Sequence, residues 1–168
     1  MQTDIKRLLA YSTVENVGIV FIGLGLAMAF RANNVAWAVD ARTGRQIWRY
    51  RRELPPRLTA CCGPVNRGFA VLGDRLFMVT LDAHLLALDI RTGTIVWDAT
   101  LADYSQGYAA TLAPVVVKDK VIVGVAGGEY GIRGFIDAYD VATGARDWRF
   151  YTVPGPGEPG HDTWAGES

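Results

Sequence analysis

Cysteine and histidine are both scarce in this 168-residue chain, which has two of each. The cysteines are adjacent, at Cys61 and Cys62, which excludes a zinc ribbon, a CxxC redox motif and the disulfide framework of a small secreted protein. An excess of charge is also lacking, because 17 Lys and Arg balance 17 Asp and Glu. Without a basic patch, the sequence predicts no nucleic-acid partner.

Apolar residues and glycine are abundant. Half of the residues are hydrophobic and 19 are glycine, so the chain is too apolar for disorder and too rich in turns for a helical bundle. Its length suits one domain and a short extra segment. We therefore expect a mostly β domain.

The N-terminal part contains one long apolar run, from residue 17 to residue 30, preceded by Lys6 and Arg7. Its length is marginal for a membrane span, and a signal peptide is an equal alternative. We expect residues 1–33 to form a hydrophobic helix, with possible membrane association through residues 10–30. The string DIKRLLAYSTVENVGIVFIGLGLAMAF, residues 4–30, resembles a transmembrane segment of the proton-pumping subunits of hydrogenase-4 and complex I. One helix cannot form a proton path, so the resemblance implies a membrane helix and no pumping.

The remaining chain contains an internal repeat. The pattern A-x-D-x-x-T-G-x-x-x-W occurs at residues 38–48, 87–97 and 138–148. Each copy is typical of a hairpin, with Asp and Gly in the turn and Trp on the second strand. A second hairpin precedes the second and third copies, at residues 68–80 and 114–126. Four short strands in about fifty residues are the unit of a β-propeller blade, and each Trp is expected to pack between neighbouring blades.

Before the first copy, the equivalent hairpin would fall on residues 19–31, inside the apolar run, where no polar turn exists. We therefore expect two complete blades, at residues 68–100 and 114–151, and the outer half of another. The predicted fold class is all-β: about two and a half blades of a propeller at residues 34–168, preceded by one hydrophobic helix. A propeller closes with four to eight blades, so this chain cannot close one alone.

Several motifs resemble the quinoprotein alcohol dehydrogenases, which are eight-bladed propellers that hold pyrroloquinoline quinone (PQQ) and a metal ion. They are the tryptophan repeats, CCGPVNRG, GGEYGIRG and the TVPGPGEPGHDTW tail. The resemblance implies a vicinal disulfide between Cys61 and Cys62 against the PQQ ring, and a bond from Arg67 to the quinone oxygens. Without this resemblance, two adjacent cysteines would be interpreted as buried reduced thiols.

The same resemblance implies roles for residues in the following loops. Glu129 would be the first carboxylate ligand of the metal, which is calcium or a lanthanide. Thr111 would bond the PQQ carboxylates, and Gly127 and Gly128 would form the backbone turn around them. Ala126 departs from family members that place a serine there. A Glu in a glycine-rich loop is otherwise usually only solvated.

The resemblance also implies what the chain does not supply. The catalytic aspartate, which acts as the base on the alcohol, is expected beyond the position of Ser168. We therefore expect a fragment of a periplasmic alcohol dehydrogenase that is inactive alone, whose parent passes electrons to a c-type cytochrome or a quinone. The alternatives are a non-enzymatic propeller scaffold, and a chimera that joins a proton-pump segment to a dehydrogenase segment near Asn33.

Overall fold

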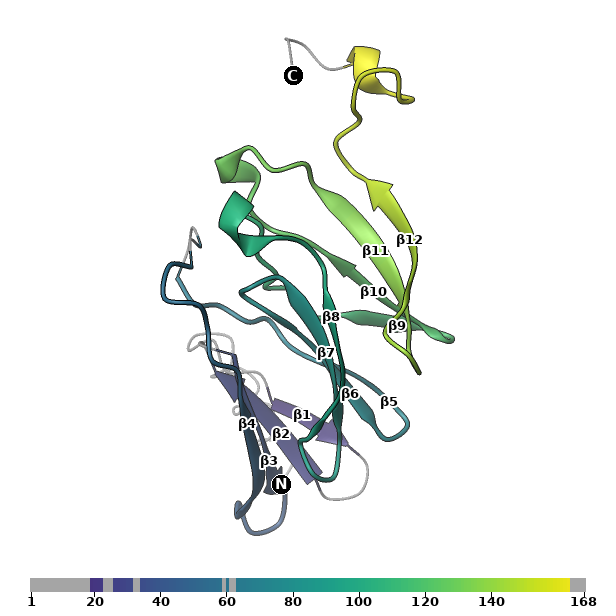
Figure 1. The fold of residues 1–168 in the computed structure, drawn as a ribbon. Coiled ribbons are helices and arrows are strands. Elements are labelled where there is room, and N and C mark those ends of the chain that lie inside the picture. The colour runs from purple at the N-terminus through teal and green to yellow at the C-terminus, as the bar shows by residue number, and fades with distance from the viewer. Residues whose placement is uncertain (1–18, 23–25, 32–33, 59, 61–62, 164–168) are drawn as a thin grey trace, which may run out of the picture.

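A computed structural model describes residues 19–22, 26–31, 34–58, 60 and 63–163, and for residues 19–31 it describes the backbone only. These residues form twelve strands in three antiparallel four-stranded sheets (Figure 1). The first sheet contains β1 (Ile19–Ile22), β2 (Leu26–Arg31), β3 (Val35–Asp40) and β4 (Gln46–Arg51). The second contains β5 (Ala70–Leu72), β6 (Arg75–Thr80), β7 (His84–Asp89) and β8 (Ile95–Thr100). The third contains β9 (Val115–Val117), β10 (Lys120–Gly124), β11 (Phe135–Asp140) and β12 (Arg146–Tyr151).

Each sheet is one blade of a propeller, with its strands in chain order. We refer to the three sheets as blades 1, 2 and 3. The first strands of blades 2 and 3, β5 and β9, contact each other at the inner edges of these blades. Short 3-10 helices lie in two of the connections, at Tyr104–Gln106 and Gly128–Tyr130, and a third follows β12 at His161–Thr163. The predicted all-β propeller fold is confirmed.

The predicted hydrophobic helix is wrong for residues 19–22 and 26–31, which are strands β1 and β2 of blade 1. β2 pairs with β3 over its whole length, so blade 1 has four strands and is not the outer half of a blade. The error has a physical reason: a short apolar run is compatible with a buried strand or with a helix, and periodicity does not separate the two. Residues 1–18 and 23–25 lie outside the described part of the chain. Among the helices that the described residues form, none is long and apolar enough to cross a membrane.

The repeated Asp and Gly shape the turn between the third and fourth strands of each blade. In blade 2, Asp89 Oδ1 accepts hydrogen bonds from the backbone N–H groups of Arg91 and Thr92, each at 2.9 Å. The turn then closes through Gly93, whose φ of 72° is costly for residues with a Cβ. Asp40 and Asp140 make the same bonds in blades 1 and 3. The Asp and Gly of the repeat are therefore structural, as predicted.

The repeated Trp joins each blade to the next one. Trp48 of blade 1 is 7% exposed, and its indole Nε1 donates to the Ile90 carbonyl of blade 2 at 2.9 Å. Its ring lies directly over Gly93, where an added Cβ would come within 2.5 Å. Trp97 of blade 2 repeats this arrangement on blade 3, with a bond to the Val141 carbonyl at 3.1 Å. The prediction that these Trp residues pack between blades is confirmed for both seams.

The hydrophobic core lies in these two seams. Between blades 1 and 2, buried side chains of β3 and β4 pack against β6 and β7, and they include Ala38, Met78 and Leu86. Between blades 2 and 3, Phe77 and Leu85 pack against Val121 and Val123. Blade 2 is therefore covered on both faces.

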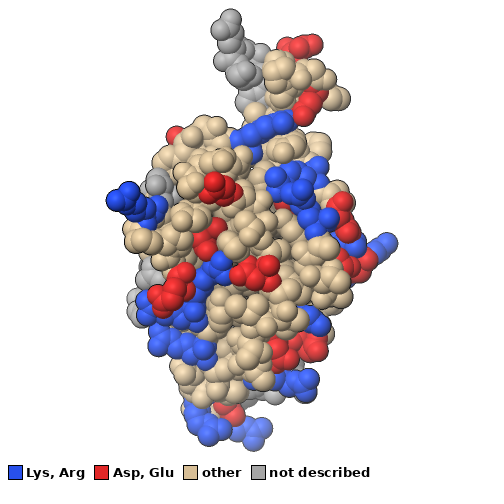
Figure 2. All heavy atoms as spheres, viewed as in Figure 1, with Lys and Arg blue, Asp and Glu red and all other residues tan. Residues whose placement is uncertain are grey.

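Arginine side chains cross-link the blades at their outer strands. Arg52, directly after β4, donates to Asp82 of blade 2 at 2.8 and 3.0 Å and to Asp98 at 2.7 Å. Arg149 on β12 donates to the fully buried Asp137 and to the Leu101 carbonyl of blade 2. Both guanidinium groups are paired with carboxylates of the same chain, so neither is free to bind an anionic ligand. On the visible face, Lys and Arg alternate with Asp and Glu without a large field of one sign (Figure 2).

Candidate functional site

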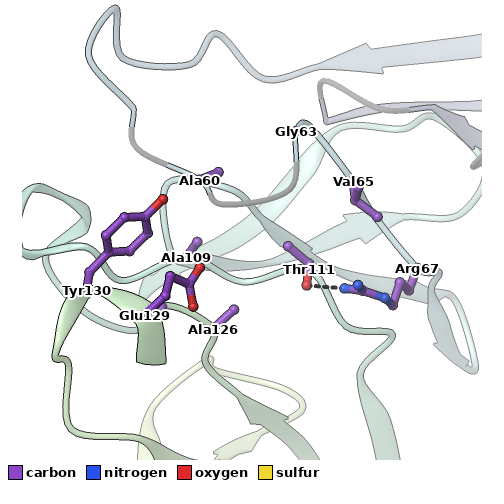
Figure 3. Close-up of a pocket in the computed structure, with 10 residues that line it drawn as sticks. Ala60, Gly63, Val65, Arg67, Ala109, Thr111, Ala126, Glu129 and Tyr130 are labelled. Atoms are coloured by element: carbon purple, nitrogen blue, oxygen red, sulfur yellow. Dashed lines mark hydrogen bonds between the residues drawn. The ribbon is translucent and has the colours of Figure 1, made fainter.

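Three connections between strands meet at one rim of the blades. They are residues 52–69 between β4 and β5, residues 101–114 between β8 and β9, and residues 125–134 between β10 and β11. Together they enclose a pocket of about 160 Å³ (Figure 3). The pocket is lined by Ala60, Gly63, Val65, Arg67, Ala109, Thr111, Ala126, Gly127, Glu129 and Tyr130.

Backbone contacts fix two of these loops against each other. Ala109 and Ala126 exchange N–H to carbonyl hydrogen bonds of 2.9 and 2.7 Å, which form an isolated bridge. Gly127, with a φ of 125°, lies so close to the neighbouring loop that an added Cβ would be 2.1 Å from the Gly107 carbonyl oxygen. A Cβ on Gly107 would in turn be 2.6 Å from Cβ of Tyr130. Glycine is therefore required at both positions, and the loops are held at a fixed distance.

Arg67 and Thr111 are joined by two contacts from different loops. The Arg67 N–H donates to the Thr111 carbonyl at 2.9 Å, and the Arg67 guanidinium donates to the Thr111 hydroxyl (Figure 3). Two hydrogen bonds fix the residue before Arg67. Asn66 is 3% exposed, and its side chain donates to the Val79 carbonyl and accepts from the Gly68 N–H. Arg67 itself is exposed. The local structure therefore presents a fixed cation and a hydroxyl to the same pocket.

Glu129 lies on the opposite side of the pocket, in the 3-10 helix Gly128–Tyr130, and it is exposed. The helix ends at Gly131 in the left-handed conformation, with its N–H bonded to the Gly128 carbonyl. Arg133 does not pair with Glu129. It bonds Glu158 and the Val153 carbonyl and lies 3.8 Å from the centre of the Tyr151 ring, so its role is structural. The Glu129 carboxylate is left to face the pocket and solvent.

The donors in the pocket suit an anionic, oxygen-rich ligand together with a hard cation. The guanidinium of Arg67 and the hydroxyl of Thr111 can bind negatively charged oxygens, and Glu129 offers the carboxylate oxygens that calcium prefers. Calcium takes six to eight oxygen ligands. Among the residues that the structure describes, no group of three or more His, Cys, Asp or Glu side chains is arranged so that it could hold a metal ion. The pocket is also smaller than the roughly 300–1,000 Å³ of enclosed ligand sites. The residues therefore fit one wall of a site for an anionic ligand and a hard cation.

The structure brings together most of the predicted site residues. Arg67, Thr111, Gly127 and Glu129 line one pocket although they come from three loops. Gly128 is adjacent and exposed, but it does not line the pocket. Cys61 and Cys62 lie outside the described residues, whereas their neighbours Ala60 and Gly63 line the pocket.

Sequence reasoning missed five residues of the lining, which are Ala60, Gly63, Val65, Ala109 and Tyr130. Four of them are small or aliphatic and carry no chemical signal. Tyr130 could have been found, because it directly follows Glu129 in the glycine-rich loop and extends toward Ala60 in the close-up (Figure 3).

Two family models match the sequence. The β-propeller domain of the glucose/ethanol/alcohol dehydrogenases matches residues 20–168, which include all twelve strands except the first residue of β1. The transmembrane family of NADH:quinone oxidoreductases and Mrp antiporters matches residues 1–38. The second match agrees with the resemblance of residues 4–30, and it overlaps the first over residues 20–38.

Individual relatives agree with the longer match. The chain is 51% identical over 157 residues to the quinohemoprotein alcohol dehydrogenase ADH IIB of Pseudomonas putida, covering 92% of this chain and 22% of the relative. It is 44% identical over 129 residues to a 1-butanol dehydrogenase (cytochrome c) of Thauera butanivorans, covering 75% of this chain and 18% of the relative.

A solved structure gives the same result for the fold. The europium-containing methanol dehydrogenase superimposes with a TM-score of 0.74 at 40% identity, over 83% of this chain and 25% of that one. The chain thus spans about a fifth to a quarter of the length of these relatives. With a family match over most of its length, the chain belongs to the glucose/ethanol/alcohol dehydrogenase family with a β-propeller domain.

Proposed function

We propose that this chain forms one wall of the cofactor site of a PQQ-dependent alcohol dehydrogenase. The observation that carries the proposal is the convergence of Arg67, Thr111 and Glu129 on one pocket from three separate loops. A propeller that served only as an assembly scaffold would have no need to place a cation, a hydroxyl and a carboxylate together at one rim.

The chain's own residues would bind and orient the cofactor. Arg67 supplies a fixed positive charge, which stabilises negative charge on the oxygens of a bound quinone. Its bond to Thr111 limits the movement of the guanidinium and sets the spacing between the two donors. The Gly127 backbone, held against Gly107, lies in the wall of the pocket and would form the turn around the bound cofactor. When bound, PQQ supplies the hydride-accepting chemistry that side chains lack.

Glu129 would hold the metal ion. It presents a carboxylate toward the pocket without a competing ion pair to Arg133, which is bonded to Glu158. Calcium and the lanthanides are both hard cations that prefer oxygen ligands. One carboxylate cannot complete their coordination, so we expect the other ligands to come from outside the described residues.

Cys61 and Cys62 would form the vicinal disulfide of the family against the cofactor. The flanking residues Ala60 and Gly63 line the pocket, which supports a place for the pair beside it. An oxidising periplasm would permit the bond. Because the chain has only these two cysteines, alkylation of the denatured chain tests the proposal: no label before reduction and two labels after it support the disulfide, whereas two labels before reduction contradict it.

In the whole enzyme the substrate would be an alcohol and the electron acceptor a c-type cytochrome or a quinone. The names of the relatives support this, since one is a 1-butanol dehydrogenase (cytochrome c). The 168-residue chain alone is expected to bind PQQ weakly and to oxidise no alcohol, because the described pocket offers a single carboxylate and is too small to hold the whole cofactor site. Alcohol-dependent dye reduction by the purified chain with PQQ and calcium would contradict that expectation.

Equilibrium dialysis of PQQ with calcium tests the proposed site. Loss of a charge-assisted hydrogen bond costs about 1.5–3 kcal/mol, so Arg67→Ala should weaken binding roughly tenfold to hundredfold. Arg57→Ala is the matched control, because Arg57 is exposed in the same loop and does not line the pocket. Equal binding by both variants would contradict the assignment.

A further inference from the structure

The connection that carries Glu129 is fixed at its start and at its end by different contacts. At its start, Gly127 lies against the backbone of Gly107. At its end, the Arg133 carbonyl accepts a hydrogen bond of 3.3 Å from the Tyr108 hydroxyl. The last residues before β11 form no helix or strand, so contacts with neighbouring segments decide where this end of the connection lies.

The side chain of Arg133 joins the same end to the C-terminal tail, residues 152–163, which follows β12 (Figure 1). Its Nε donates to the Val153 carbonyl at 2.8 Å, and its Nη2 donates to the Glu158 carboxylate. The guanidinium also lies 3.8 Å from the centre of the Tyr151 ring. A planar guanidinium bonds and stacks at the same time, whereas the ammonium of lysine is a point charge. Lysine would therefore keep the charge of Arg133 without reproducing these three contacts.

Glu158 is itself held in place within the tail. Its Oε2 accepts a hydrogen bond of 2.9 Å from the Gly155 N–H, and its own N–H donates to the Gly155 carbonyl at 3.0 Å. The Gly155 N–H, and then the charge of Arg133, lower the pKa of Glu158 below its ordinary value. The side chains of Arg133 and Glu158 are 35% and 43% exposed. An exposed ion pair alone stabilises little, but a network of contacts around it stabilises more.

We propose that Arg133 and Glu158 are positioning residues for Glu129, so that the C-terminal tail sets the affinity of the rim pocket for its cation. This inference rests on the proposed role of Glu129 as a metal ligand. Glu129 lies between the two fixed ends, in the short helix Gly128–Tyr130. Release of one end would let the carboxylate take positions in which it does not face the pocket. The apparent affinity then falls in proportion to the fraction of molecules that keep a competent site.

Amide hydrogen exchange in the chain without metal tests the positioning directly. The N–H groups of Tyr130 and Gly131 donate to carbonyls three residues earlier, so their exchange rates, measured by NMR, report whether the short helix is formed. Arg133→Lys and Glu158→Gln should each speed exchange at both amides about threefold to tenfold. Exchange at Gly144, in the turn between β11 and β12, should not change.

Terbium luminescence tests the effect on the cation. Tb³⁺ is a hard lanthanide ion, and Tyr130 beside Glu129 can sensitise its emission. Arg133→Lys leaves the net charge unchanged, so a purely electrostatic role predicts equal binding, whereas the proposal predicts binding about threefold to tenfold weaker. Asp162→Asn is the matched control for Glu158→Gln, because it removes one carboxylate from a fully exposed position of the same tail. It should bind terbium like the wild-type chain.

Each outcome separates the positioning from the metal assignment. Unchanged exchange at Tyr130 and Gly131 in Arg133→Lys would overturn the proposal, whatever the terbium titration shows. Faster exchange together with wild-type terbium binding would also overturn it, because the connection would then move without affecting the site. Glu129→Gln tests the proposed function itself. If that variant binds terbium as tightly as the wild-type chain, the metal assignment is wrong and the claimed effect on the cation is wrong with it, while the exchange rates still decide whether Arg133 orders the connection.

Discussion

The seams between the blades and the rim pocket are built on the same three sheets, but from different kinds of residue. The seams use the positions that repeat in every blade, where a buried Trp lies over a glycine turn. The pocket uses positions that occur once, in loops whose lengths differ from blade to blade. We infer that the repeated residues stabilise the fold, whereas the residues that depart from the repeat form the binding site. The following substitutions test this separation.

Trp48→Ala should have the largest effect on stability. Deleting a buried Trp costs about 3–5 kcal/mol in the free energy of unfolding, measured by urea denaturation. Trp148→Ala, at the equivalent position with 46% exposure, should cost less than about 1 kcal/mol. Similar losses from both variants would show that the seam is not what stabilises the blades.

Asp137→Ala should destabilise the chain by about 3 kcal/mol. Asp137 is fully buried and accepts two hydrogen bonds of 2.7 Å from Arg149, so its loss leaves a cation at the seam without its partner. The matched surface substitution is Glu53→Ala, which removes an ion pair to Arg51 whose side chains are 60% and 85% exposed. It should change the free energy of unfolding by less than about 0.5 kcal/mol.

Gly93→Ala should be more costly than Gly73→Ala. Both glycines have a positive φ, so each substitution strains the backbone by about 1–2 kcal/mol. Only the Cβ at position 93 would also collide with a ring, that of Trp48. We expect an additional loss of about 1–3 kcal/mol at position 93 from overpacking. Equal losses in thermal or urea unfolding would contradict the contact between Trp48 and the turn.

Acid should weaken the repeated turns. Backbone N–H bonds, first from Thr92 and then from Arg91, lower the pKa of Asp89 below its ordinary value, and the corresponding turn residues lower those of Asp40 and Asp140. A carboxylate with a lowered folded-state pKa stabilises the fold above its unfolded pKa of about 4, and this stability is lost as the pH falls through the folded value. Replacing the three Asp by Asn, which keeps an acceptor oxygen, should flatten part of the loss of stability below pH 4. The same loss of stability below pH 4 in the variant and in the wild-type chain would contradict this expectation.

The smallest effect on stability is expected in the pocket. Arg67→Ala and Glu129→Gln alter exposed side chains, so the free energy of unfolding should change by less than about 0.5 kcal/mol. The same substitutions should weaken binding of PQQ or metal. A pocket substitution that unfolds the chain would contradict the claim that the seams, and not the pocket, provide its stability.

The propeller fold could be predicted from the sequence because its signal is repeated. The Asp, Gly and Trp of each copy recur at fixed spacing, and two of the three Trp residues fill seams as expected. The inner half of blade 1 could not be predicted, because β1 and β2 come from one uniformly apolar run. Such a run has the composition of a membrane helix as well as that of a buried hairpin.

The candidate site could be predicted in part, through motifs that carry chemistry. Arg67, Thr111 and Glu129 were identified from the family pattern, and they meet in one pocket. Ala109 and Val65 could not be found, since small apolar side chains line a pocket only through the path of the backbone. The close approach of Gly107 to Gly127 is also invisible in the sequence, because it joins two loops that are not neighbours in the chain.

Titration of the ¹⁵N-labelled chain with PQQ and calcium, followed by NMR, tests the central claim most directly. It detects weak binding and locates it at the same time. The proposal predicts shifts concentrated on the amides of Arg67, Thr111 and residues 127–130, with the turn at Gly73 and strand β8 unchanged. Shifts absent up to the solubility limit, or concentrated on the open face of blade 3 around Trp148, would contradict the assignment of the rim pocket as the cofactor wall.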